Sequence, residues 1–289
     1  MTMTLFLPIS TLLITTTRCS SLLFHSQPIL NHRATLSAGH RSINTILKTS
    51  SSSTSSTLPP KRIFCYGDSL TAGTAFPSPE LFPYGPHLEQ ELNKIFTSDT
   101  VESSSSSSVV VRWRGLPGWT ASAMVDYVDD PSTGLRSALT GIRNPSLSLV
   151  IILAGTNDIG SLTSSMIRID NDDIDANVAV EPILKLHKTC LDCEGDDGTN
   201  DIRTLAVGIP GSGWQEMNSK AATLCSGMND ALRNFASSHP ERVTYLDFPF
   251  PYQRGDAKWS DDGLHMSSEG YETLGRELAP CVKQILDRI

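Results

Sequence analysis

The first 60 of the 289 residues contain no aspartate or glutamate, although the whole chain has 31 acidic residues. The same stretch holds four basic residues and 23 serines and threonines. A leader that is basic, rich in hydroxyl groups and free of acid is typical of an organelle transit peptide. We therefore expect residues 1–60 to be a targeting or disordered leader, addressed to a plastid or mitochondrion, and residues 61–289 to form one domain.

Long apolar runs are scarce as well. The apolar stretch at residues 5–14 is interrupted by Pro8 and follows no positive charge, so it lacks the pattern of a secretory signal. It is also much shorter than the roughly 20 residues that span a bilayer. The nearest approach to an N-glycosylation site, residues 144–146, has proline in the position that prevents modification. We expect no membrane span, and secretion is the alternative destination.

Basic residues are few in the predicted domain. Without the leader, 19 basic and 31 acidic residues are left, which gives a formal charge of −12. A surface with this excess of negative charge repels nucleic acid and anionic membranes. We therefore expect a small-molecule partner and no nucleic acid, while the sequence specifies no oligomeric state.

The six cysteines form neither a disulfide framework nor a metal-binding pattern. Cys190 and Cys193 have the spacing of a metal-binding pair, but no second pair completes a zinc site. We expect these two thiols to lie at a helix end or in a loop, and we expect no metal site.

Three motifs of common α/β enzymes are missing. The serine at position 69 is followed two residues later by Thr71, so the Gly-x-Ser-x-Gly elbow of the α/β-hydrolases is absent. Residues 67–73 contain no lysine and cannot form a phosphate-binding loop of the P-loop type. No Gly-x-Gly-x-x-Gly follows the first predicted strand, which disfavours a dinucleotide-binding fold.

Short apolar runs alternate with longer segments of helical period after the leader, and this alternation predicts a parallel sheet covered by helices. The predicted strands are residues 62–66, 109–113, 147–153, 202–207 and 243–247. Apolar residues at helical spacing predict helices over 88–96, 121–127, 135–142, 174–187, 217–235 and 271–285. The fold class is a three-layer α/β/α sandwich with a five-stranded parallel sheet, flavodoxin-like in arrangement.

Three polar clusters follow predicted strands. Gly-Asp-Ser-Leu at 67–70 follows the first strand, Gly-Thr-Asn-Asp at 155–158 the third, and Asp-Gly-Leu-His at 262–265 comes after the fifth. Carboxyl ends of parallel strands meet at one edge, where ligand sites form. Each cluster alone could be ordinary turn chemistry, since Asp and Ser also cap helices and a histidine can simply pack.

Together, these clusters resemble the four sequence blocks of the SGNH or GDSL hydrolases. The blocks here are residues 64–73, 116–120, 155–158 and 262–265. The resemblance covers about residues 61–288. It implies a serine ester hydrolase with Ser69 as nucleophile, His265 as base and Asp262 as the residue that orients it. It also implies oxyanion donors on Ser69, Gly118 and Asn157, although Gly115 lies close enough to compete with Gly118.

The chemistry of these residues agrees with the implied roles. A serine hydroxyl needs a neighbouring base to take its proton, and imidazole titrates in the suitable range. Asp262 lies three residues before His265, so one local loop can place its carboxylate on Nδ1–H and leave Nε2 facing Ser69. The Ser69 N–H, the Gly118 N–H and the Asn157 amide can then stabilise a tetrahedral oxyanion.

Other residues near these blocks have two interpretations. Trp119 and Trp259 flank two of the blocks and could wall a substrate pocket, as could Trp214, but each could instead be ordinary packing. Asp68 and Asp158 are expected to tie down their loops through hydrogen bonds.

The sequence therefore predicts hydrolysis of a small or medium carboxylic ester through an acyl-enzyme, with no metal or cofactor. The resembling family includes arylesterases, thioesterases, lysophospholipases and carbohydrate acetylesterases, and the resemblance does not choose among them. Two alternatives are an acyltransferase with the same triad and a catalytically silent carbohydrate- or lipid-binding module.

Overall fold

The computed structural model describes residues 60–99, 108–141, 147–164, 174–193 and 202–289. All of them belong to one compact unit that runs from Ser53 to Ile289. Apart from Pro60, the predicted leader lies outside the described residues. Within the described ranges, no helix combines the length and apolarity that a membrane crossing requires.

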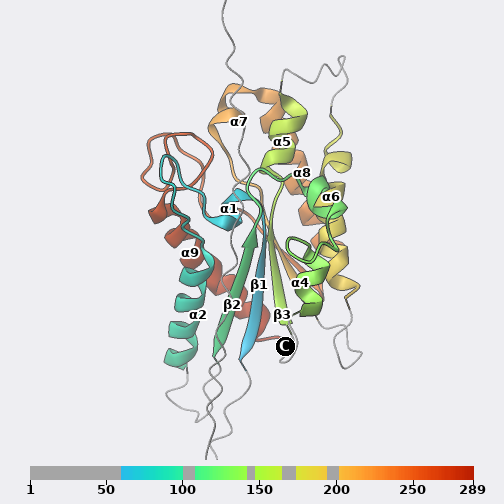
Figure 1. Ribbon diagram of the computed structural model, residues 1–289, viewed down its shortest axis with the longest axis vertical. Helices are drawn as coiled ribbons and strands as arrows, with labels where there is room; N and C mark the ends of the chain where they lie inside the picture. The colour runs from blue at the N-terminus through green and yellow to red at the C-terminus, as the bar shows by residue number, and fades with distance from the viewer. Residues whose placement is uncertain (1–59, 100–107, 142–146, 165–173, 194–201) are drawn as a thin grey trace, which may run out of the picture. The chain divides into compact units, whose positions relative to one another are not determined.

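Five parallel strands form one sheet in the order β2-β1-β3-β4-β5 (Figure 1). The strands are β1 (Lys61–Gly67), β2 (Val109–Gly115), β3 (Leu147–Leu153), β4 (Arg203–Val207) and β5 (Val243–Leu246). The predicted strands agree with these to within two residues at either end, and the strand order is the flavodoxin-like one. The predicted fold class is confirmed.

Helices cover both faces of this sheet (Figure 1). They are α1 (Ser69–Ala72), α2 (Gly85–Asp99), α3 (Ala121–Asp126), α4 (Leu135–Gly141), α5 (Thr156–Thr163), α6 (Ala176–Leu191), α7 (Gly213–Met217), α8 (Ser219–Ser238) and α9 (Ser268–Leu286). The buried side chains of α2 and α9 pack on one face, and those of α3, α4, α6 and α8 pack on the other.

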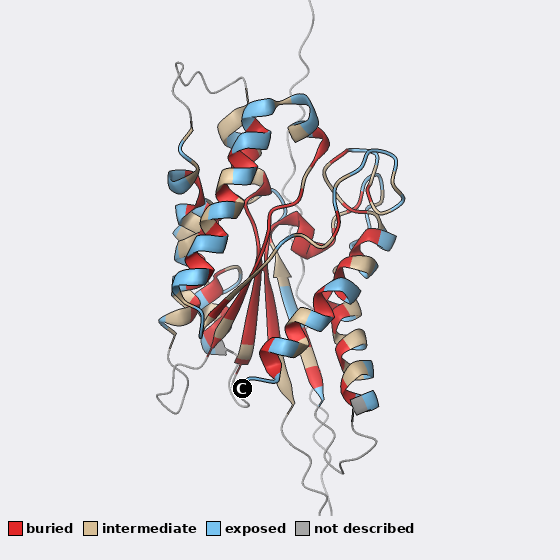
Figure 2. Cartoon of the chain, turned by 180° about the vertical axis from the view of Figure 1, so that it is seen from behind, coloured by how far each residue is buried: buried red, intermediate tan, exposed pale blue. Residues whose placement is uncertain are grey.

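The central strands are buried on both faces, which Figure 2 shows as red ribbon through the middle of the sheet. In β3, Leu149 and Ile151 face the α2 and α9 side, whereas Val150 and Ile152 face the α6 and α8 side. A strand buried on both sides needs apolar residues at successive positions. This requirement explains why residues 147–153 form a nearly uninterrupted apolar run.

One predicted helix is divided in the structure. The apolar spacing over 217–235 predicts a single helix that begins at Met217, but Met217 ends α7 and is 72% exposed. The Asn218 side chain accepts hydrogen bonds from the N–H groups of Lys220 and Ala221 and so starts α8 anew. Such a cap supplies partners for the free N–H groups of a first helical turn, which apolar spacing does not reveal.

Candidate active site

Three polar side chains from distant parts of the chain meet at the carboxyl edge of the sheet. The hydroxyl oxygen of Ser69 lies 2.9 Å from Nε2 of His265, and Nδ1 of the same ring lies 2.6 Å from Oδ2 of Asp262. Ser69 follows β1, whereas the other two lie between β5 and α9. The structure therefore brings together the three residues that the resemblance assigns to one site.

These contacts determine which nitrogen of His265 carries the proton. An ionised carboxylate only accepts, so Nδ1–H donates to Asp262, and Nε2 of the neutral ring accepts from the Ser69 hydroxyl. Partial burial by itself raises the pKa of Asp262, but hydrogen bonds from the His265 ring and from the N–H groups of Leu264 and His265 outweigh it and lower the pKa. Asp262 is therefore ionised at neutral pH and holds the ring in one orientation.

Asp262 is itself held by its own loop. Its Oδ1 accepts from the N–H groups of Leu264 and His265, both at 2.9 Å, which leaves Oδ2 for the imidazole. Gly263 has a φ of +71°, in the left-handed region that favours glycine. The N–H of Ser260 closes the loop by donating to the His265 carbonyl at 2.8 Å. One short loop thus builds the whole carboxylate–imidazole pair.

Ser69 is presented by a tight turn from β1 into α1. Gly67, the last residue of β1, lies so close to the Leu153 carbonyl of β3 that a Cβ would overlap it. Asp68 then caps α1, because its Oδ1 accepts from the Leu70 N–H at 2.9 Å. The turn is therefore a helix cap, and the same cap directs the Ser69 hydroxyl toward the histidine.

The other predicted oxyanion donors lie on the two neighbouring segments. Asn157 is in the first turn of α5, directly after β3, and its amide donates to the Trp119 carbonyl at 3.0 Å. An amide has two N–H groups, and the described residues offer this one no second partner. Gly118 precedes Trp119 in the turn after β2. The Asn157 bond therefore joins the two segments and leaves one N–H for a ligand.

The structure separates the two glycines that compete for the donor position. Gly115 is the last residue of β2, and a Cβ there would overlap the backbone of Ala72 in α1, so this glycine serves close packing. Gly118 has a φ of +79°, and no atom lies within 4 Å of the position that a Cβ would take. Gly115 is therefore explained by close packing, whereas Gly118 has no such constraint and stays the predicted oxyanion donor.

Asp158 fastens α5 to α3. Its two carboxylate oxygens both accept from the Ala121 N–H, at 3.1 and 2.9 Å. Ala121 begins α3, two residues after Trp119. As predicted, both aspartates tie down their loops through hydrogen bonds, since Asp68 caps α1 and Asp158 binds the first residue of α3.

The cysteine pair lies away from these residues. Cys190 is buried in the last turn of α6 and Cys193 follows just beyond the helix, as the sequence predicts. Burial raises the pKa of both thiols. In the part of the chain that the structure describes, no group of three His, Cys, Asp or Glu side chains is arranged to hold a metal ion.

A family model described as the GDSL-like Lipase/Acylhydrolase family matches residues 65–273, which include every residue of the site. The chain belongs to this family. Membership supports ester hydrolysis as the class of reaction. A search of curated proteins finds no match.

Solved structures share the fold of this family member at low sequence identity. An aryl esterase from M. smegmatis is 23% identical, with a TM-score of 0.55, and the match covers 78% of this chain and 99% of that one. A carbohydrate acetylesterase from Sinorhizobium meliloti is 21% identical, with a TM-score of 0.54 and the same coverage of both chains. The two similarities confirm that this chain has the α/β fold of these solved esterase structures.

Trp259 does not wall a pocket. It is only 6% exposed, its indole N–H donates to the Pro251 carbonyl at 3.1 Å, and its ring packs against Phe248, Phe250 and Tyr252. The expectation of a pocket role is therefore wrong for this residue, which belongs to the core beneath the histidine loop. Trp119 is half-buried, with its ring edge-to-face against Tyr127 at 5.3 Å.

Trp214 is more exposed than Trp119 and Trp259. It is 39% exposed, and its indole N–H donates to the Thr163 hydroxyl at the end of α5 at 2.8 Å. Its neighbour Gly213 donates its N–H to the Gly263 carbonyl at 2.7 Å. The indole is therefore held between the helix that carries Asn157 and the loop that carries Asp262.

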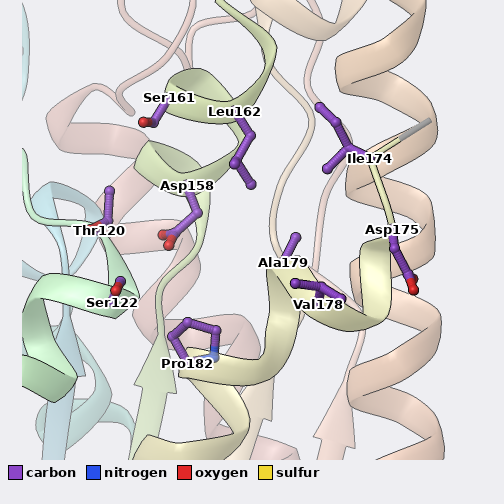
Figure 3. Close-up of a pocket in the computed structure, with 10 residues that line it drawn as sticks. All are labelled: Thr120, Ser122, Asp158, Ser161, Leu162, Ile174, Asp175, Val178, Ala179 and Pro182. Carbon is purple, nitrogen blue, oxygen red and sulfur yellow. The ribbon is translucent and has the colours of Figure 1, made fainter. Parts of the chain in front are cut away.

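A pocket of about 470 Å³ lies between α3, α5 and α6 (Figure 3). The residues that line it are Thr120, Ser122, Asp158, Ser161, Leu162, Ile174, Asp175, Val178, Ala179 and Pro182. Neither Ser69 nor His265 is among them. Because the Asp158 carboxylate on its wall is bonded to the Ala121 N–H, this wall is part of the link between α5 and α3.

Proposed function

We propose that this protein is a serine esterase that cleaves small or medium carboxylic esters through an acyl-enzyme on Ser69. The observation that carries the proposal is the continuous series of contacts from Ser69 through His265 to Asp262, at 2.9 and 2.6 Å. A hydroxyl, a base and an orienting carboxylate in hydrogen-bond contact are the requirements for an activated serine.

The reaction follows from these contacts in two halves. Ser69 Oγ attacks the ester carbonyl carbon while His265 Nε2 takes the hydroxyl proton, and Asp262 stabilises the imidazolium that forms. The tetrahedral intermediate then breaks its bond to the alkoxy oxygen, which takes the proton from Nε2 and leaves as the alcohol. Water attacks the acyl-enzyme in the same manner, with His265 again as base. The carboxylic acid leaves, and the Ser69 hydroxyl is restored.

Replacing Asn157 with alanine is expected to lower kcat by about 10² to 10³ and to change KM little, because the free amide N–H contributes mainly when charge has developed on the oxygen. Steady-state kinetics with a chromogenic ester measure both constants. Asn157→Asp, whose carboxylate cannot donate, should show the same loss, and both variants also lose the bond to the Trp119 carbonyl. A rise in KM with unchanged kcat would instead make Asn157 a substrate-binding residue.

Trp214 is proposed to contact the acyl or alcohol group of the substrate. Trp214→Ala is expected to raise KM by about tenfold, with a smaller effect on kcat, because an apolar contact surface is lost. The matched control is Trp113→Ala, since Trp113 is 40% exposed but lies on the edge strand β2 beside Gly85 of α2. Equal KM values for the two variants across a panel of alkyl, aryl and sugar esters would contradict the proposal.

Hydrolysis is favoured over acyl transfer because the site is open to water. The side chains of His265 and Asp262 are 17% and 23% exposed, so water can approach the base. Product analysis with competing alcohols separates the two activities, since an acyltransferase yields mainly the new ester. A silent binding module is disfavoured because no residue of the nucleophile, base, orienting and donor set is missing.

We propose that residues 1–60 direct the protein to a plastid or mitochondrion and contribute nothing to folding. A chain that starts at Leu58 is expected to unfold at the same temperature as the full chain and to retain its kcat, because it keeps β1. The control is a chain that starts at Asp68, which loses β1 and its pairing with β2 and β3, and should not fold. Failure of the Leu58 chain to fold would contradict the leader hypothesis.

A further inference from the structure

The helix α5, which carries Asn157, has little apolar packing to hold it. Its buried residues are Thr156, Asp158 and Ile159, so Ile159 is the one large apolar side chain that α5 buries fully. A helix of eight residues is marginal by itself, and Gly160 in its middle weakens it further. The position of Asn157 therefore depends on the contacts that hold α5 at its two ends.

The first turn of α5 is held from one side and its last turn from the other. The bonds of Asn157 and Asp158 described above fasten the first turn to the segment that begins α3. At the last turn, the Thr163 hydroxyl accepts from the Trp214 indole N–H at 2.8 Å, and the Thr163 carbonyl accepts from the Asn218 amide at 3.2 Å. Trp214 lies in α7 and Asn218 directly follows it, so α7 is bonded to α5 near both of its own ends (Figure 1).

The Thr163 hydroxyl serves both helices at once. It donates its proton to the Ile159 carbonyl one turn earlier in α5, at 2.7 Å, and accepts from Trp214 with a lone pair. A hydroxyl has one proton to donate and two lone pairs, so the two bonds are compatible. A single side chain thus links the end of α5 to α7.

The same short helix α7 is bonded to the histidine loop. The Gly213 N–H donates to the Gly263 carbonyl at 2.7 Å. The Tyr252 hydroxyl lies 3.1 Å from the position that a Cβ would take on either glycine, so glycine at both positions allows this close approach. Because Asp262 and His265 lie in this loop, α7 connects the base of the site to the helix that carries the oxyanion donor.

We propose that Thr163 is a positioning residue, which through its bond to Trp214 fixes α5 so that the Asn157 amide faces the oxyanion formed at Ser69. The inference rests on the proposed esterase activity. An oxyanion donor acts only when it is already in place as charge develops, and a displacement of about 1 Å can remove much of its effect. Thr163 thus acts on the reaction through Asn157.

The first test removes the Thr163–Trp214 bond from either side. Thr163→Val keeps the shape of the side chain, and its kcat is expected to fall about three- to tenfold, the effect of one lost hydrogen bond, with little change in KM. Thr163→Ser restores the hydroxyl and should recover most of kcat. Trp214→Phe keeps an aromatic ring without the N–H and should lower kcat by a similar factor. The double variant should be no slower than either single one, because both lose the same bond.

Thr189 is the matched control for the bond within the helix. Its hydroxyl donates to the Lys185 carbonyl one turn earlier in α6, at 3.0 Å, as that of Thr163 does in α5. Among the described residues, it has no partner in another helix. Thr189→Val should therefore keep wild-type kcat, which would separate the loss of the bond to α7 from the loss of a bond within one helix.

The second test asks whether Thr163 acts through Asn157. Thr163→Val should lower the kcat of an Asn157→Ala enzyme by far less than it lowers that of the wild type, because the donor that it positions is already gone. A general loosening of the site would lower both by the same factor. Equal losses in the two backgrounds, or a Thr163→Ser variant as slow as Thr163→Val, would overturn the proposal.

Amide hydrogen exchange gives a readout that does not need catalysis. In Thr163→Val the amides of α5 are expected to exchange about three- to tenfold faster than in the wild type, while those of α9 keep their rate. Unchanged exchange in α5 would contradict the claim that this bond holds the helix. If the wild type hydrolyses no ester, the proposed function fails, whereas the exchange rates still show whether Thr163 fixes α5.

Discussion

Replacing either Ser69 or His265 with alanine is expected to lower kcat by about 10⁴-fold or more while the fold stays intact. The Ser69 hydroxyl donates to His265 Nε2 at 2.9 Å, so each residue is useful only in the presence of the other. The double variant should therefore be little slower than either single variant. Steady-state kinetics of the three variants, with circular dichroism as the check on folding, measure this non-additivity.

The controls for this experiment are Ser237→Ala and His239→Ala. Both residues lie at the end of α8, where their side chains bond the carbonyls of Arg233 and Phe235. These variants should retain wild-type kcat. If the losses at Ser69 and His265 multiplied in the double variant, the two residues would act independently, and the assignment of nucleophile and base would be wrong.

Asp262→Asn is expected to cost about as much, about 10⁴-fold in kcat, because it changes the tautomer of the histidine. An asparagine can keep its oxygen on the N–H groups of Leu264 and His265, as Oδ1 of Asp262 does now. Its NH₂ group then faces Nδ1 and donates to it, so the ring proton moves to Nε2. A protonated Nε2 cannot take the proton of Ser69.

Two neighbouring carboxylates provide the controls for Asp262. Asp256 is engaged elsewhere, since it binds the Lys258 ammonium at 2.7 Å, and Asp261 has no contact with the imidazole among the described residues. Asp256→Asn and Asp261→Asn should each keep kcat/KM within a few-fold of the wild type. If Asp262→Asn kept its activity from pH 5 to 9 while one of these lost it, the orienting role would belong to the other aspartate.

The sheet and the three reacting residues could be predicted because their signals are local. Burial on both faces makes β3 a nearly uninterrupted apolar run, and the spacing of Asp262 and His265 places both in one loop. Ser69 is predicted to lie near Asp262 and His265 because the carboxyl ends of all parallel strands lie at the same edge of the sheet.

The remaining features depend on contacts that leave no pattern in the sequence. The helix α5 has eight residues, too short for helical period to show, and its fastening by Asp158 depends on Ala121, 37 residues away. Trp259 flanks the histidine loop in sequence, but only the folded chain shows that the ring points into the core. The motif around Asp68 predicts a helix cap, but it does not predict that this side chain is fully buried.

The most direct test of the central claim is covalent labelling with a fluorophosphonate followed by peptide mass spectrometry. An activated serine displaces fluoride and retains the phosphonyl group on its oxygen, whereas an ordinary buried serine does not react. The account predicts a single modification on Ser69 in the wild type, and none in the Ser69→Ala or His265→Ala variant. A wild type that hydrolyses esters with Ser69 unlabelled, or with the label on another serine, would contradict it.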